Sequence, residues 1–121
     1  MERVRLSENF FLDEFECKCC GGVFSLDPML VEKLQELRNR VGPITITSGT
    51  RCPKHNTEIY TNIGKQPTKL AIHTLGKAAD ITFPGIRDHM DDIRGLFNGI
   101  GWANGWVHVD VRDKRTEWNY T

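Results

Sequence analysis

The chain has 121 residues, which is enough for one domain with a hydrophobic core and too few for two. Its 16 basic and 16 acidic residues cancel, so the charge gives no reason to expect a nucleic-acid partner. No apolar run approaches the roughly 18 residues of a membrane span, and we expect no membrane partner. Residues 1–5 lack the apolar stretch of a signal peptide, so we expect synthesis in the cytoplasm.

Hydrophobic spacing and turn residues predict short helices and strands in an irregular order. In chain order they are a short helix or turn at 7–16, a helix at 28–41, a strand at 43–48, a short helix at 53–60, a strand at 77–83, a helix at 86–100, a loop at 101–105 and a strand at 106–112. The helix at 28–41 has the clearest ends, with Asp27 as N-cap and Gly42 as terminator. Because the predicted elements do not repeat in a strand–helix–strand order, we expect an α+β fold with a small, mostly antiparallel sheet and flanking helices.

The strands predicted at 77–83 and 106–112 each have an apolar face and a polar face. Three valines alternate along the apolar face of the second strand. Its opposite face carries Trp106, His108, Asp110 and Arg112. Such a polar set is costly to bury unless it lines a cleft. Arg112 fits a structural ion pair better than a site for a substrate carboxylate.

Two histidines and a carboxylate on separated segments predict a metal site. His73, Asp80 and His108 form the His₂-carboxylate set that catalytic zinc uses, which leaves a coordination position for water. Gly76 permits the tight turn that would bring His73 back toward Asp80. A lone histidine is usually a surface or core residue, but the joint pattern favours ligands. With only one anionic ligand the zinc remains a strong Lewis acid, so the set indicates hydrolysis.

The cysteines leave three interpretations open. They are Cys17, Cys19, Cys20 and Cys52. Without an export signal, reduced and buried thiols are the default. Alternatively, Cys17, Cys20, Cys52 and His55 have the ligand types and local spacing of a second, structural zinc site. The third interpretation is a disulfide between the Cys17–Cys20 cluster and Cys52.

Three motifs in order carry a resemblance to a known family. They are SGTRCPKHN at 48–56, HTLGKAAD at 73–80 and HVD at 108–110. Together they resemble the zinc D-Ala-D-Ala carboxypeptidase family, whose wider group includes VanX-type dipeptidases, L-alanyl-D-glutamate endopeptidases and the hedgehog signalling domain. The resemblance extends over roughly residues 7–112.

The resemblance implies a fold like that of the hedgehog domain and the DD-peptidases, a substrate class and particular residue roles. His73, Asp80 and His108 would be the zinc ligands. Arg51 matches the family arginine that contacts the substrate and stabilises the developing oxyanion, a role that suits a permanently charged guanidinium. The implied substrates are the stem peptides of peptidoglycan.

The chain departs from the family pattern at two places. Family members often have a serine two residues before the first histidine, where this chain has Ala71. Many also have a general base two or three residues before the last ligand, but Trp106 and Gly105 cannot accept a proton. Asp110 shares a strand face with His108 and is our candidate for the base. The alternative is a carboxylate that orients a ligand imidazole. Trp106 either lines a substrate subsite or only packs.

These features predict a monomeric zinc peptidase that hydrolyses bonds next to D-amino acids in stem peptides. A second possibility is a zinc-stabilised binding or structural module without catalysis, which the missing base favours. The absence of a signal and of a wall-binding module is compatible with a phage lysis or virion enzyme, which would reach the cell wall by delivery.

Overall fold

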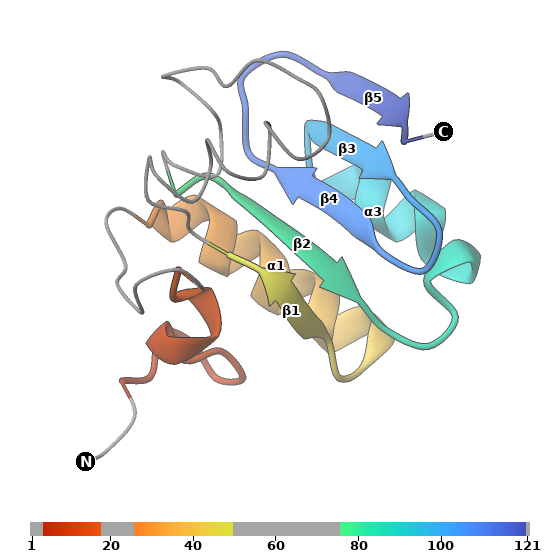
Figure 1. Cartoon of the computed structure of the whole chain (residues 1–121). Helices are drawn as coiled ribbons and strands as arrows, with labels where there is room; N and C mark the ends of the chain where they lie inside the picture. Colours follow the sequence, from red (N-terminus) through yellow and green to blue (C-terminus); the bar gives the residue numbers. More distant parts are fainter. Residues whose placement is uncertain (1–3, 18–25, 50–75, 121) are drawn as a thin grey trace.

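The computed structural model describes residues 4–17, 26–49 and 76–120. In chain order their elements are η1 (Leu12–Phe15), α1 (Pro28–Val41), β1 (Thr45–Ser48), β2 (Ala78–Thr82), η2 (Ile86–His89), α3 (Met90–Leu96), β3 (Gly99–Trp102), β4 (Val107–Asp110) and β5 (Thr116–Asn119). Helices α1 and α3 lie on the same face of the sheet (Figure 1). Since these helices cover one face, polar side chains of a functional site are expected on the opposite face of the sheet.

The strands of these segments form one sheet in the order β1-β2-β4-β3-β5. The pairs β1–β2, β2–β4 and β3–β4 are antiparallel, and only β3–β5 is parallel. The prediction of an α+β fold with a small, mostly antiparallel sheet and flanking helices is confirmed.

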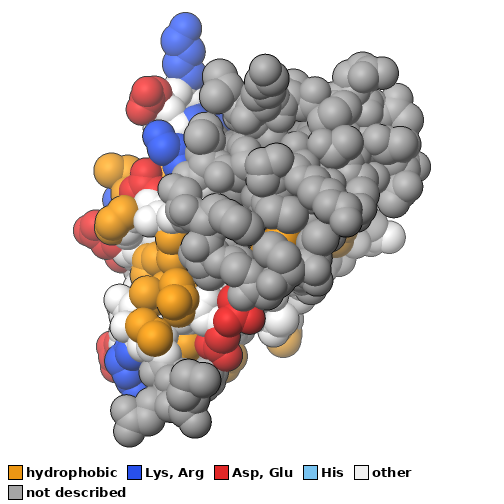
Figure 2. Space-filling model, turned by 60° about the vertical axis from the view of Figure 1, so that its left-hand side comes forward, with side chains coloured by type: hydrophobic (Ala, Val, Ile, Leu, Met, Phe, Trp, Pro, Cys, Tyr) orange, Lys and Arg blue, Asp and Glu red, His pale blue; other side chains and the backbone are white. Residues whose placement is uncertain are grey.

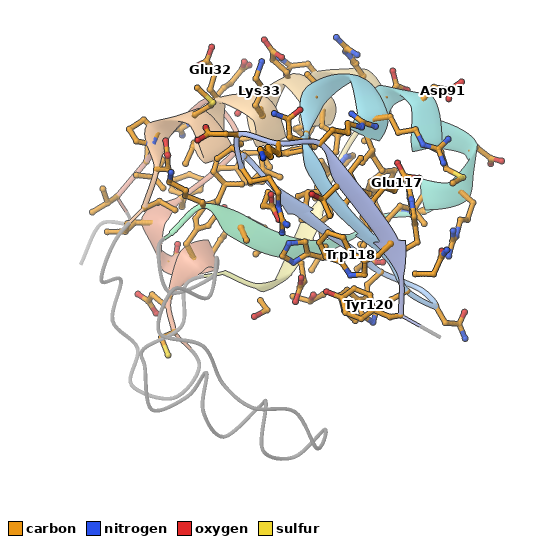
Figure 3. All side chains as sticks on the ribbon, turned by 90° about the horizontal axis from the view of Figure 1, so that it is seen from above. Glu32, Lys33, Asp91, Glu117, Trp118 and Tyr120 are labelled. Carbon is orange, nitrogen blue, oxygen red and sulfur yellow. The ribbon has the colours of Figure 1, made fainter. Side chains whose placement is uncertain are left out.

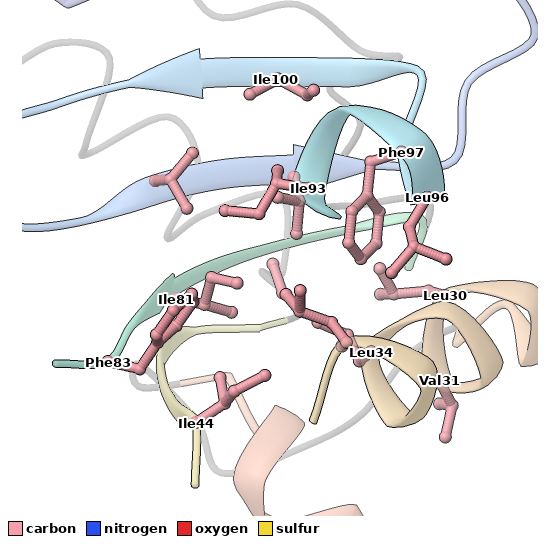
Figure 4. Packing of buried hydrophobic residues seen from close by; sticks show 14 of the residues in the cluster. Leu30, Val31, Leu34, Ile44, Ile81, Phe83, Ile93, Leu96, Phe97 and Ile100 are labelled. Carbon is pink, nitrogen blue, oxygen red and sulfur yellow. The ribbon is translucent and has the colours of Figure 1, made fainter. Parts of the chain in front are cut away.

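The hydrophobic core lies between the helices and one face of the sheet (Figure 4). Its buried members include Leu30, Leu34, Leu37, Ile81, Ile93, Phe97, Ile100, Val107 and Val109. Side chains alternate along a strand, so burial of Val107 and Val109 on the helix side turns His108 and Asp110 to the opposite face. The same alternation turns Asp80 away from the core. Both polar faces predicted from the sequence therefore lie on the side of the sheet opposite α1 and α3.

Helix α1 has the ends that its sequence predicts. The side chain of Asp27 accepts a hydrogen bond of 2.9 Å from the backbone N–H of Met29. Gly42 ends the helix with φ at 92°, and its N–H donates to the carbonyl of Arg38. A positive φ favours glycine, because it has no Cβ to clash with the backbone.

The helix predicted at 86–100 is shorter than expected, and its last part is a strand. The helical residues end at Leu96, and Gly99–Trp102 forms β3, so the loop predicted at 101–105 is also wrong for its first two residues. Phe97 and Ile100 are buried in the core, as a helical periodicity would also require. Both conformations bury these residues, and the apolar pattern alone could not separate them.

Strand β5 was not predicted. Its residues Thr116–Asn119 are mostly exposed and have no run of apolar side chains. Pairing with β3 holds the strand at the edge of the sheet, and backbone hydrogen bonds flank it from Thr116 to Asn98 and from Tyr120 to Trp102. This long-range pairing leaves no local signal in the sequence.

The surface of the described segments carries charges of both signs. On the face drawn in Figure 2, basic, acidic and hydrophobic side chains all appear within the described part. The large hydrophobic residues that are exposed within this described part are Val4, Met29 and Tyr120. None of the helices in these segments is long and apolar enough to cross a bilayer.

Candidate active site

The site begins with the register between β2 and β4. Asp80 lies directly opposite His108 in this antiparallel pair, and Ala78 lies opposite Asp110. Directly opposed side chains on one face of a sheet are close enough to interact. The register thus places the two predicted metal ligands of the sheet next to each other, with Asp110 beside them.

His108 contacts a carboxylate through each of its ring nitrogens. Nδ1 lies 3.2 Å from Oδ1 of Asp80, and Nε2 lies 2.6 Å from Oδ2 of Asp110. The His108 side chain is buried. Burial lowers the pKa of His108, but the hydrogen bonds with Asp110 and Asp80 outweigh it and raise the pKa above its ordinary value. The imidazole is therefore held in one orientation by two acidic groups.

Asp110 is fully buried and is bound from two sides. Besides its contact with His108, it accepts hydrogen bonds from Nε and Nη2 of Arg112 at 2.8 and 2.6 Å, and one from the backbone N–H of Arg112. Burial raises the pKa of Asp110, but the hydrogen bonds from His108 and Arg112 hold it well below the usual range of a carboxyl group. Arg112 is the ion-pair partner of Asp110, as its position on the polar face predicts.

The spacing of Asp80 and His108 fits a shared metal ion. Two ligand atoms at zinc-binding distance from one tetrahedral zinc lie about 3.3 Å apart. The separation of 3.2 Å between Nδ1 of His108 and Oδ1 of Asp80 is close to this value. On the other side of the ring, Asp110 contacts Nε2, and a carboxylate on that side of a metal-bound imidazole commonly orients it. In residues 4–17, 26–49 and 76–120, no three His, Cys, Asp or Glu side chains are placed to hold one metal ion together, so Asp80 and His108 can supply only part of a site.

Two glycines of β3 leave room for side chains on the face of the sheet that carries His108 and Asp110. A Cβ on Gly99 would collide with the carboxylate of Asp110, which lies across the β3–β4 pair. A Cβ on Gly101 would lie 2.6 Å from Nε1 of Trp118. Strand β3 therefore presents bare backbone to this face, over which the side chains of its two neighbours extend.

Aromatic rings lie beside the His108 imidazole. The Trp118 ring centre is 5.2 Å from that of His108, and Tyr120 lies 6.0 Å from Trp118 and 5.1 Å from Trp106. In Figure 3, Trp118 and Tyr120 lie on the side of the sheet away from Glu32 and Lys33 of α1. Of these three rings, Trp106 was a candidate from the sequence. Trp118 and Tyr120 were not, although their i, i+2 spacing could have indicated a shared strand face.

Several predicted site residues lie outside the described segments. They are Arg51, His73, Cys20, Cys52 and His55. Their proposed roles as oxyanion stabiliser, third zinc ligand and second-zinc ligands stay predictions. Of the proposed second-zinc set, Cys17 is described, and it is buried. The described residues give no support to a second zinc site.

A histidine and a carboxylate spaced for one metal, with another carboxylate behind the imidazole, are typical of metal-dependent hydrolases. The family model described as Peptidase M15 matches residues 8–110, most of the chain. The chain belongs to this family, and its membership supports a zinc metallopeptidase that acts on peptidoglycan-type substrates. A search of curated proteins finds no match.

Proposed function

We propose that the chain is a zinc metallopeptidase that hydrolyses peptide bonds next to D-amino acids in peptidoglycan stem peptides. The observation that carries the proposal is the pairing of His108 with Asp80 at 3.2 Å, within a chain of the M15 family. His73 is the third ligand in this proposal. When bound, zinc polarises the scissile carbonyl and lowers the pKa of its water toward about 7.

In this proposal Asp110 orients His108 instead of acting as the general base. Asp110 contacts Nε2 of the imidazole, whereas the nitrogen that faces Asp80 is Nδ1. A carboxylate at Nε2 lies across the ring from the nitrogen that would bind the metal, so it would be poorly placed to take a proton from the attacking water. Its low pKa, caused by the hydrogen bonds from His108 and Arg112, also makes it a weak proton acceptor.

The remaining proposed roles are those of Arg51 and Trp106. Arg51 binds the substrate and stabilises the negative charge that develops on the carbonyl oxygen. Trp106 lies in the short segment before β4 and contacts the substrate from that side. The general base is then a group other than Asp110, Trp106 or Gly105.

The test uses purified muropeptides and protein loaded with one equivalent of zinc. Mass spectrometry should find new amino termini, and release of free D-alanine would distinguish a carboxypeptidase from an endopeptidase. His108→Ala should lose both the zinc and the products. Full zinc content in His108→Ala would contradict the ligand assignment.

A zinc-stabilised module without catalysis is the second candidate, favoured by Trp106 and Gly105 at the usual positions of the base. It predicts tight zinc binding and no product from any muropeptide. A phage lysis or virion enzyme would share the proposed chemistry and differ in how it reaches the wall.

A further inference from the structure

Three aromatic side chains form a continuous surface beside the candidate metal site. We call Trp106, Trp118 and Tyr120 the aromatic wall. The ring centres of Trp106 and Tyr120 are 5.1 Å apart, and those of Tyr120 and Trp118 are 6.0 Å apart. The wall ends at His108, whose imidazole centre lies 5.2 Å from that of Trp118.

The fold positions this wall through the edge of the sheet. Gly101 lies opposite Trp118 in the β3–β5 pair, and its missing side chain lets both the Trp118 and Tyr120 rings lie against β3. On the other face of β5, Glu117 forms an ion pair of 2.9 Å with Arg94. Figure 3 shows Glu117 on one side of β5 and the two rings on the other. Trp118 and Tyr120 lie beyond the family match, which ends at residue 110.

The wall suits an apolar group better than a charged one. The guanidinium of Arg112 lies over the Trp118 ring at 5.0 Å, but two of its nitrogens already donate to Asp110. A substrate carboxylate would therefore have to compete with Asp110 for this cation. By contrast, Tyr120 leaves 45% of its surface exposed next to the half-buried Trp106. Covering an exposed aromatic ring with an apolar group is favourable, because both surfaces are removed from water.

We propose that the aromatic wall is a specificity subsite for the apolar side chain of the substrate residue next to the scissile bond. This inference rests on the proposed function. Consecutive Cα atoms of a peptide are about 3.8 Å apart, and the ring centres of His108 and Trp118 are 5.2 Å apart, so a residue at the cleaved bond is close enough to contact the wall. In a stem peptide the group that fits this description is the methyl group of alanine.

The experiment measures binding of two peptides to zinc-loaded protein by calorimetry. One is a stem pentapeptide, and the other is its analogue in which every alanine is replaced by glycine. A methyl group in an apolar subsite changes affinity by about 10-fold or more, so wild type should prefer the alanine peptide by about that factor. Tyr120→Ala should reduce the preference to near unity by weakening binding of the alanine peptide.

Two variants serve as controls, and zinc content is measured for each. Tyr120→Phe keeps the ring and should keep the preference. Met29→Ala removes another exposed hydrophobic side chain, on α1, and should also keep it. An undiminished preference in Tyr120→Ala, or equal affinity of wild type for both peptides, would overturn the subsite. If the peptides are cleaved, the ratio of their kcat/KM values replaces the ratio of affinities. The preference thus decides this inference, whereas only the product assay decides the proposed reaction.

Discussion

Replacing Asp110 with asparagine separates the two roles that this carboxylate could have. The substitution keeps the size of the side chain and removes its negative charge. In the native protein the carboxylate accepts hydrogen bonds from His108 and Arg112 and has no exposed surface. Asparagine has one acceptor oxygen and one NH₂ donor, so in either orientation its NH₂ group faces a donor of His108 or of Arg112. Arg112 is 30% exposed and can turn to water, whereas His108 is buried and cannot.

The magnitude of the effect follows from these contacts. Leaving a buried donor without its partner costs about 1–3 kcal/mol, which is the expected loss of unfolding free energy. Loss of a group that orients a metal-bound histidine typically lowers metal affinity or activity by about 10- to 100-fold. If Asp110 were the base, kcat would instead fall by about 10²- to 10⁴-fold while zinc affinity stayed normal.

Zinc affinity is measured by competition with a chelator, and kcat is measured at saturating zinc. We expect weaker zinc binding in Asp110→Asn and substantial recovery of activity with excess metal. Asp91→Asn changes a fully exposed carboxylate on α3 and should match wild type in both assays. Normal zinc affinity in a folded Asp110→Asn protein would refute the orienting role.

The same carboxylate predicts a pH dependence of the metal-free protein. The folded-state pKa of Asp110 is below its ordinary value because of the hydrogen bonds from His108 and Arg112, which outweigh burial. Its contribution to the unfolding free energy is therefore fully present above a pH of about 4, the ordinary carboxyl pKa, and is lost as the pH falls below that value. Denaturant titrations at several pH values should show a smaller acid-side loss in Asp110→Asn than in wild type.

Three further substitutions test the fold around the site. Gly99→Ala should destabilise the protein by about 1–3 kcal/mol in a denaturant titration and weaken zinc binding, because its Cβ would collide with Asp110. Gly95→Ala is the control: a Cβ at Gly95 would have nothing within 4 Å, so this substitution should be neutral or slightly stabilising. Leu34→Ala should cost about 2–5 kcal/mol in thermal or chemical unfolding, because the side chain is fully buried. Asp27→Ala should cost about 0.5–2 kcal/mol by removing the N-cap of α1, and an unchanged unfolding midpoint would contradict the capping argument.

The features that the sequence predicts well are those with a local cause. Helix α1 was predicted with its bounds because Asp27 and Gly42 mark its two ends. The polar faces of β2 and β4 were predicted because side chains alternate along any strand. The alternation within a strand does not determine which residues of two strands lie opposite each other. The direct opposition of Asp80 and His108 is therefore seen only in the fold.

The features that the sequence did not predict depend on distant parts of the chain. Strand β3 has glycines where a strand usually shows polar residues, and these glycines are explained only by Asp110, Trp118 and Tyr120 lying against them. Strand β5 is mostly exposed and is a strand because β3 offers an unpaired edge. Which nitrogen of His108 meets Asp110 likewise depends on Asp80 of β2, which contacts the other nitrogen of the ring.

The position of β5 at the sheet edge determines where the chain can be shortened. A fragment that stops at residue 110, where the family match ends, would lose β5 and leave β3 as an open edge. Open edges pair readily with other chains and promote aggregation. The backbone hydrogen bond from Tyr120 to Trp102 would be lost as well. Fusion partners and affinity tags attached at this end should therefore begin after Tyr120, with the last strand kept whole.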